Sequence, residues 1–388
     1  MKSHRQLKVD FRRGNSNGIG TEVFCRRLIR LQQQIQTEAQ RSSISHNVQI
    51  LSRLRIETGF FFMTTNPDTY DILIIGAGPS GIACAIEAKK AGLNYLVIDQ
   101  GGIANSIQHF QRDMFFFSTP ELLEIGDVPF VVQAVRPTSL DCVKYYRKVA
   151  EYYRLHFRFY ERIVESLKRD DEFVLRSLAG NEYRSRALVI ATGYYDTPNS
   201  LNVPGEDLPH VSHFYTDPFP YYQQEVLIVG GKNSAVEAAL DLYRHGAKVT
   251  VIHRGSRLSE GVKYWLLPDF DNRVAQGAIK VHFNTYVKEF KKEGTVLENS
   301  NGEHREHKTD FAFILIGYRP DVTFLQSLGI EIESDSLAPF HNPETMETNV
   351  ENLFVAGGLV GGRFNNKVFI ENGREHGTKI IGKLTERL

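Results

Sequence analysis

A glycine-rich turn near residue 78 is the part of this chain best suited to chemistry, because it is built to hold a nucleotide pyrophosphate. Gly76, Gly78 and Gly81 form a GxGxxG pattern between an apolar run and a helical period. The first glycine permits a tight turn, the second lets a pyrophosphate approach the backbone, and the third lets helix and strand pack closely. The helix then presents unpaired N–H groups and a partial positive charge to the phosphates. Asp99 ends the next apolar run, where its carboxylate can accept hydrogen bonds from a ribose diol.

A second turn, GGKNSA, departs from this pattern at two positions. Lys232 replaces the middle glycine and Ala235 the last one. At the position that matches Asp99 stands His253, followed closely by two arginines. An acid there would repel a 2′-phosphate, whereas a His-Arg pair attracts one, so the second nucleotide is predicted to be NADPH. The predicted NADPH-binding residues are Gly230, Gly231, Lys232, Asn233, Ser234, Ala235, His253, Arg254 and Arg257.

The elements that must position both turns form an internal repeat. Residues 71–99 and 225–253 align without a gap, and each copy reads as an apolar run, a glycine turn, a helical period, a glycine and a second apolar run. Continuous Val, Ile and Leu runs indicate strands buried on both faces of a parallel sheet. Gly92 and Gly246 stand where a helix would end in the left-handed conformation. Each copy is therefore predicted to be a βαβ unit, and the fold class α/β, with two Rossmann-like dinucleotide-binding domains of three-layer type.

Two similar segments, 186–199 and 310–321, mark where the chain is expected to cross between the domains. Each is a strand of buried type that ends in Gly-Tyr and is followed by a proline. The expected first domain is discontinuous, residues 63–195 plus 313–388, and the second is inserted as residues 196–312. Residues 1–62 are Arg-rich and precede Met63. We interpret them as a disordered leader or the product of a misassigned start codon.

Composition excludes several other classes of protein. Lys plus Arg and Asp plus Glu both number 46, and this zero net charge argues against binding nucleic acid through bulk charge. No apolar run approaches the roughly 18 residues that a bilayer span needs, so no membrane partner is expected. Cys25, Cys84 and Cys142 form no CxxC and no zinc-type cluster. We therefore expect no metal site, and a reducing cytoplasm as the compartment.

Longer strings make the chain resemble a known family. GAGPSG at 76–81, ATGYYDTPN at 191–199 and ENLFVAGG at 351–358 look like the thioredoxin-reductase-like flavoproteins with two dinucleotide-binding domains. More narrowly, the strings MFFFSTPELLEIGDVPF, VKYWLLPDFDNRV and FIENGREHG are similar to the bacillithiol disulfide reductase family. The resemblance implies an enzyme that passes hydride from NADPH to FAD and then two electrons to a low-molecular-weight thiol disulfide. It also implies a small-molecule disulfide or a small redox protein as partner, and a homodimer.

The same resemblance assigns FAD to the first domain and names its contacts. The last helix, which is expected to begin near Asn372 and Gly373, would point its positive end at the flavin. The FAD-binding residues that the resemblance implies are Gly76, Gly78, Pro79, Ser80, Gly81, Asp99, Gln100, Asn105, Thr192, Gly193, Gly357 and Gly358.

Two departures from the relatives concern cysteine. Thioredoxin reductases carry a CxxC in the NADPH domain and this chain has none, so it cannot relay electrons through such a dithiol. Many bacillithiol-linked members carry Cys directly after the Gly-Pro of the first turn, where this chain has Ser80. Cys84 and Cys142 are interpreted as packing residues, and no catalytic residue is assigned.

Three alternative functions stay open at this point. A ferredoxin or flavodoxin NADP reductase would share the missing CxxC and would present a basic patch at the flavin edge to an acidic partner. A flavin monooxygenase would share the two turns, although Val203 and a spacing of five residues from Gly205 to His210 fail its FxGxxxH signature. A non-enzymatic sensor would bind both nucleotides without turnover, so NADPH would not bleach its flavin.

Overall fold

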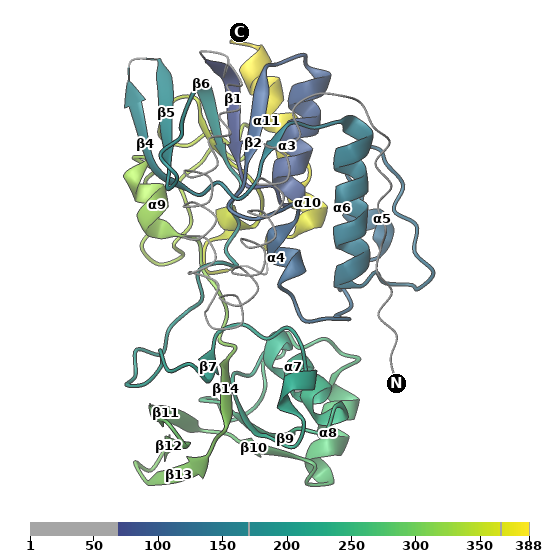
Figure 1. The fold of residues 1–388 in the computed structure, drawn as a ribbon, viewed down its shortest axis with the longest axis vertical. Coiled ribbons are helices and arrows are strands. Elements are labelled where there is room, and N and C mark those ends of the chain that lie inside the picture. Colours follow the sequence, from purple (N-terminus) through teal and green to yellow (C-terminus); the bar gives the residue numbers. More distant parts are fainter. Residues whose placement is uncertain (1–68, 170, 365–366, 388) are drawn as a thin grey trace, which may run out of the picture. The chain divides into compact units, whose positions relative to one another are not determined.

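The first sheet is built on the apolar runs that flank the first glycine turn. The computed structural model describes residues 69–169, 171–364 and 367–387 (Figure 1), so the leader expected over residues 1–62 lies outside the described residues. Strands β1 (Tyr70–Ile75) and β2 (Tyr95–Ile98) are almost wholly buried and pair in parallel, and helix α3 (Pro79–Lys90) connects them. Pro79 suits the first turn of α3 because no helical hydrogen bond is required of its nitrogen.

Among the residues that the structure describes, seven strands make up this sheet, in the order β3-β2-β1-β6-β5-β4 with β15 paired to β6. The parallel partners of β6 (Glu182–Ile190) are β1 on one side and β15 on the other, so the chain returns to this sheet near its C-terminal end. The remaining strands are β3 (Phe157–Arg158), β4 (Ile163–Arg169), β5 (Glu172–Ser177) and β15 (Leu353–Val355).

The helices of this part pack around α3. Helix α11 (His376–Thr385) packs on α3, and the approach is so close that a Cβ added at Gly377 would lie 2.9 Å from the Ala83 carbonyl oxygen. Helix α6 (Ser139–Tyr153) also packs on α3 and begins with a capping box between Thr138 and Asp141. The shorter helices are α4 (Asn105–Gln108), α5 (Pro120–Leu123), α9 (Val322–Ser327), η2 (Gly357–Gly361) and α10 (Ile370–Gly373).

The second sheet repeats the arrangement of the first. Its strand order is β10-β9-β8-β14-β7, all parallel, and helix α7 (Asn233–Arg244) connects β8 to β9. The elements are β7 (Val211–Ser212), η1 (Phe219–Tyr221), β8 (Glu225–Val229), β9 (Lys248–Ile252), α8 (Leu267–Ala275), β10 (Ile279–His282) and β14 (Phe311–Ile314).

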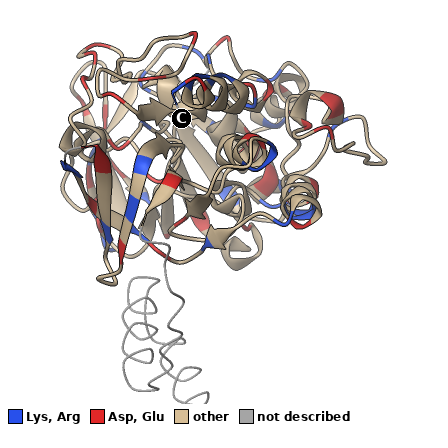
Figure 2. Cartoon of the chain, turned by 90° about the horizontal axis from the view of Figure 1, so that it is seen from above, with Lys and Arg blue, Asp and Glu red and all other residues tan. Residues whose placement is uncertain are grey.

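A small antiparallel sheet accompanies the second one. Its strands are β11 (Thr285–Lys291), β12 (Gly294–Asn299) and β13 (His304–Lys308), in the order β11-β12-β13. Strand β13 reads HREHK, and four of its five residues are exposed. Elsewhere basic and acidic residues are interspersed along the elements (Figure 2), as in the ion pairs of Arg176 and Arg184 with Glu182.

The predicted repeat and fold class are confirmed. The units β1-α3-β2 and β8-α7-β9 share parallel pairing, and the helix-terminating glycines adopt the expected left-handed conformation, with φ of 74° at Gly92 and 86° at Gly246. Apolar clusters bury both faces of the second sheet. Cys84 and Cys142 are fully buried in the first core, which confirms their packing role.

The two Gly-Tyr segments lie side by side. Pro198 and Tyr318 form an antiparallel bridge, the Asn199 amide donates to the Gly317 carbonyl at 3.0 Å, and the Arg319 amide donates to the Thr197 carbonyl at 2.9 Å. The division into domains stays a prediction. Strand β14 crosses the expected boundary at 312–313 and belongs to the second sheet over its whole length.

Candidate functional site

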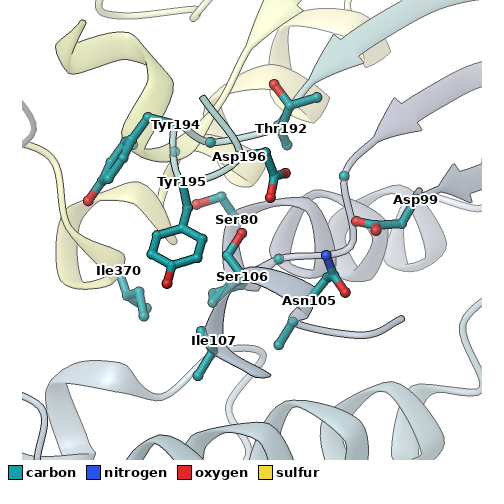
Figure 3. Close-up of a pocket in the computed structure, with 18 of the residues that line it drawn as sticks. Ser80, Asp99, Asn105, Ser106, Ile107, Thr192, Tyr194, Tyr195, Asp196 and Ile370 are labelled. Atoms are coloured by element: carbon teal, nitrogen blue, oxygen red, sulfur yellow. The ribbon is translucent and has the colours of Figure 1, made fainter. Parts of the chain in front are cut away.

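A cavity of about 670 Å³ lies at the carboxyl ends of strands β1, β2 and β6. Figure 3 shows how separate segments meet there, since Asp99 follows β2, Asn105 begins α4, and Thr192 follows β6. Ligands of open α/β sheets bind at this edge, outside the carboxyl ends of the strands. Every residue expected to contact FAD lines the cavity except Gly81, which lies inside helix α3.

The first glycine turn has the shape that a pyrophosphate requires. A Cβ added at Gly76 would lie 2.4 Å from the Ala191 carbonyl oxygen, and one at Gly81 would lie 1.9 Å from the Gly76 carbonyl oxygen. These two glycines are therefore required by packing. A Cβ at Gly78 would meet nothing within 4 Å, so the backbone there is open toward the cavity. This open cradle at the N-terminus of α3 fits the phosphates of FAD.

Asp99 ties the end of β2 to the glycine turn. Its Oδ2 accepts from the Ala77 amide at 2.6 Å and its Oδ1 accepts from the Gly101 amide at 2.7 Å. Burial raises the pKa of Asp99, while the two amide donors oppose this rise. Each carboxylate oxygen keeps a further lone pair, so the residue can also accept from a ribose hydroxyl.

Other expected FAD contacts are held by neighbours from distant segments. Gln100 Nε2 donates to Asp196 Oδ2 at 2.7 Å, which links the loop after β2 to the loop after β6. The Asn105 side chain lies over Gly101, where an added Cβ would be 2.1 Å from Asn105 Oδ1. The carboxamide of Asn105 therefore depends on glycine at position 101.

Ser80 packs against the late glycines. A Cβ at Gly357 would lie 2.5 Å from Ser80 Oγ, and one at Gly373 would lie 3.1 Å from it. The Gly357 amide donates to His376 Nδ1 at 3.1 Å. Burial lowers the pKa of His376 to about 4, so the ring is neutral and can accept this bond near pH 7. The first turn, the late glycines and α11 thus form one packed unit.

The far end of the cavity is lined by aromatic side chains. The sequence analysis did not identify all the residues that line it. Met114, Phe116 and Phe117 line this end together with Phe369, and Phe117 is 61% exposed. The last helix, α11, begins at His376 rather than near Asn372, and the separate short helix α10 precedes it from Ile370 to Gly373. Further lining residues that sequence reasoning did not single out are Ser106, Ile107, Ser118, Glu161, Tyr194, Asp196, Lys263, Ile370 and Glu371.

The second glycine turn is shaped by its own neighbours. A Cβ at Gly230 would lie 2.5 Å from the Leu315 carbonyl oxygen, and one at Gly231 would lie 2.5 Å from His253 Nδ1, so the His253 ring covers this glycine. Lys232 is exposed with an extended backbone and precedes α7, and Ala235 is fully buried. An extended, exposed lysine is compatible with a nucleotide on the turn.

The basic residues after β9 differ in how available they are for contact with a 2′-phosphate. Arg254 is exposed, whereas Arg257 Nη2 pairs with Glu260 Oε1 at 2.6 Å. Burial and the adjacent Arg254 lower the pKa of His253, so its ring is neutral near pH 7. Arg254 is therefore the stronger candidate for a 2′-phosphate contact.

Neither cysteine of the described part of the chain lines the cavity. Burial raises the pKa of the Cys84 thiol to about 12 and the pKa of Cys142 even further. Thiols with such pKa values are not nucleophiles at neutral pH. Among the residues described, no group of three or more His, Cys, Asp or Glu could hold a metal ion, and no helix is long and apolar enough to cross a membrane.

Comparison with known proteins supports this architecture. A sequence model described as "Pyridine nucleotide-disulphide oxidoreductase" matches residues 73–357. The bacilliredoxin reductase Bdr of Bacillus subtilis (strain 168) is 40% identical over 315 residues, which are 81% of this chain and 97% of that protein.

Two solved structures agree in fold and sequence. The bacillithiol disulfide reductase Bdr (YpdA) from Bacillus cereus superposes with a TM-score of 0.80 at 40% identity, over 82% of this chain and all of that one. The corresponding protein from Staphylococcus aureus gives a TM-score of 0.79 at 39% identity, over 82% and 99% of the two chains.

These matches confirm the resemblance drawn from the GAGPSG, ATGYYDTPN and ENLFVAGG strings. The cofactors are FAD and NADPH, and the protein is an NADPH-dependent flavoprotein oxidoreductase. The residues that bind each cofactor stay predictions, which the cradle at Gly78 and the basic residues after β9 support. By its sequence and its fold, the chain belongs to the pyridine nucleotide-disulphide oxidoreductase family, in the group of the Bdr proteins.

Proposed function

We propose that the protein uses NADPH to reduce a low-molecular-weight thiol disulfide of the bacillithiol type. The observation that carries the proposal is the cavity, which runs from the pyrophosphate cradle at Gly78 to an exposed aromatic end at Phe117 and Phe369. An acceptor can approach the flavin through that end. The two bacillithiol disulfide reductases of known structure, at 39–40% identity, support this choice of acceptor, whereas the Bacillus subtilis relative is named for bacilliredoxin.

The two cofactors supply the redox chemistry, because FAD accepts a hydride from NADPH and passes two electrons to an acceptor. In the net reaction one NADPH and one proton are consumed, the S–S bond of the acceptor breaks, and NADP⁺ and two thiols are released. The role of the residues of the chain is to bind and orient the cofactors. The cradle at Gly78 would hold the pyrophosphate, Asp99 the ribose, and the start of α10 would face the flavin.

The position of Ser80 bears on how electrons reach the acceptor. Ser80 lines the cavity, whereas Cys84 and Cys142 are buried in the core. We therefore propose that neither Cys84 nor Cys142 relays electrons, so that a flavin bound in the cavity would have to supply them to the disulfide itself.

The proposed function is tested by an anaerobic stopped-flow titration of the purified yellow protein with NADPH. We expect the visible flavin band to bleach and then to recover on addition of oxidised bacillithiol. Recovery with ferredoxin or flavodoxin but not with the disulfide would favour the ferredoxin reductase alternative. Recovery only with O₂, together with an oxygenated product, would favour the monooxygenase. A flavin that NADPH does not bleach would indicate the nucleotide sensor and overturn the proposal.

A change at Arg254 tests the second nucleotide site. Arg254→Ala is expected to raise the KM for NADPH about tenfold, the loss of one hydrogen bond to a charged group. The KM for NADH should change little, because NADH lacks the 2′-phosphate. Arg257→Ala should have a smaller effect, since the Arg257 guanidinium is already paired with Glu260. Equal losses with both nucleotides would contradict the assignment, and steady-state kinetics decide the question.

The finer assignments of assembly and compartment are also proposals. A homodimer is supported by exposed apolar side chains on the loop before α6, where Val131 is 87% and Val135 is 75% exposed. A cytoplasmic location is supported by the two buried free thiols, which suit a reducing compartment. Sedimentation of the wild type and of a Val131→Asp, Val135→Asp variant would test the assembly.

A further inference from the structure

Lys263 follows the second βαβ unit in the sequence and reaches the cavity at the first one. It lies on the loop between β9 and α8, and its side chain is only 9% exposed. It lines the cavity near the aromatic segment that contains Phe117. A lysine this deeply buried must be paired and hydrogen-bonded, so its partners define what it holds together.

The ammonium of Lys263 joins two elements that are far apart in the sequence. Its Nζ donates to Glu237 Oε1 at 2.6 Å and to the Phe115 carbonyl oxygen at 3.0 Å. Glu237 lies on α7, the helix that follows the second glycine turn, whereas Phe115 precedes Phe116 and Phe117, which line the cavity. Lys263 therefore connects the nucleotide-binding helix to the wall of the flavin cavity.

The backbone of Lys263 is held by the glycine turn itself. Asn233 Oδ1 accepts from the Lys263 amide at 2.7 Å, and Asn233 Nδ2 donates to the Gly261 carbonyl oxygen at 3.0 Å. Asn233 is the first residue of α7, at the helix end where a pyrophosphate would lie. A nucleotide that engages Asn233 would compete for the carboxamide that fixes the loop.

Trp265, on the same loop as Lys263, makes a further contact with the aromatic segment that contains Phe115 and Phe117. Its ring centroid lies 5.4 Å from that of Phe117, and the Arg136 guanidinium lies 4.5 Å from the indole. The Lys263 ammonium lies 5.8 Å from the centroid of the same ring, so a displacement of Lys263 would change the surroundings of Trp265. Because Trp265 is the single tryptophan of the chain, tryptophan fluorescence reports on the surroundings of this one side chain.

We propose that Lys263 is a positioning residue that transmits nucleotide occupancy of the second glycine turn to the aromatic end of the flavin cavity. When a nucleotide engages Asn233, the loop that carries Lys263 and Trp265 shifts, and the contacts with Phe115 and Phe117 change with it. This inference rests on the proposed function, since it assumes that NADPH binds at the second turn.

The experiment uses the full chain with FAD bound and NADP⁺ as the probe, because NADP⁺ occupies the site without reducing the flavin. The wild type is expected to show a saturable change in Trp265 emission. In Lys263→Met, calorimetry should show somewhat tighter NADP⁺ binding, because binding no longer has to disturb the Lys263 contacts. The emission change should disappear, and the rate of flavin bleaching by NADPH should fall about tenfold. Lys263→Arg, which keeps a cation able to reach both partners, should restore part of the emission change and of the rate.

Two further variants keep the result interpretable. Lys280→Met removes an exposed lysine of β10 and should behave as the wild type. The double variant Glu237→Leu, Lys263→Met removes both buried charges, so it guards against misfolding from an unpaired Glu237, and it should show the same losses as Lys263→Met.

The inference is overturned if the wild type binds NADP⁺ without an emission change, or if Lys263→Met or the double variant keeps the emission change and the bleaching rate. Failure of NADPH to bleach the wild-type flavin would instead refute the proposed function. The NADP⁺ titration would still decide the role of Lys263, because it does not depend on reduction.

Discussion

Gly78→Glu should yield a folded protein without the yellow colour of bound FAD. The backbone at Gly78 has φ of −75°, which any residue can adopt, and an added Cβ meets nothing within 4 Å. The new side chain would fit the fold but occupy the pyrophosphate position with a negative charge. An unpaired charge of this kind weakens FAD binding by at least about 100-fold. Visible absorbance of the purified protein and an FAD titration measure the effect.

The matched control is Gly382→Glu. Gly382 lies on α11, is exposed, and likewise has nothing within 4 Å of an added Cβ, so this variant should stay yellow. Gly81→Ala should differ from both variants by impairing folding, because the new Cβ would lie 1.9 Å from the Gly76 carbonyl oxygen. A yellow Gly78→Glu protein with wild-type FAD affinity would show that the cradle does not bind the pyrophosphate.

The second large effect concerns stability in acid and depends on His376. Burial lowers the pKa of His376 from 6.5 to about 4 in the folded protein. Between these values the unfolded chain binds more protons than the folded one, so lowering the pH favours unfolding. At pH 5 the loss attributable to His376 is about 2 kcal/mol relative to pH 7.5, and it stops growing below about pH 4. Protonation would also remove the acceptor of the Gly357 amide.

The comparison variant is His376→Asn, because the amide oxygen of asparagine can accept from Gly357 but does not titrate. Denaturant unfolding of the FAD-bound proteins at pH 7.5 and pH 5 gives the free energy of unfolding for each. The wild type should lose about 2 kcal/mol more than His376→Asn between the two pH values. Equal losses of the free energy of unfolding would mean that folding does not lower the pKa of His376. The ring would then be protonated in the folded protein at pH 5, and its burial would not be maintained in solution.

The sequence was sufficient for the βαβ units because their signals are local. The alternation of apolar runs, glycine turn and helix lies within 29 consecutive residues in each copy, 71–99 and 225–253. Asp99 could be assigned for the same reason, since the length of one helix fixes its distance from the turn. The left-handed glycines at 92 and 246 likewise follow from where each helix must end.

The contacts that complete the cavity could not be predicted, because they join residues that are distant in the sequence. Lys263 and Phe115 are 148 positions apart, and the Ser118 hydroxyl donates to Glu371 across 253 positions. No periodicity or spacing rule relates such pairs. The start of the last helix was misplaced for a local reason, since a turn at residues 374–375 separates the short helix α10 from α11.

The composition of β13 has a consequence for how the protein behaves at high concentration. This strand is last in the order of its small sheet, and the outer strand of a sheet is where another extended chain can add. Its HREHK sequence places Arg305, Glu306 and Lys308 at this edge as exposed side chains. A strand that joined here would have to desolvate these charges, so the edge resists aggregation and strand exchange between molecules.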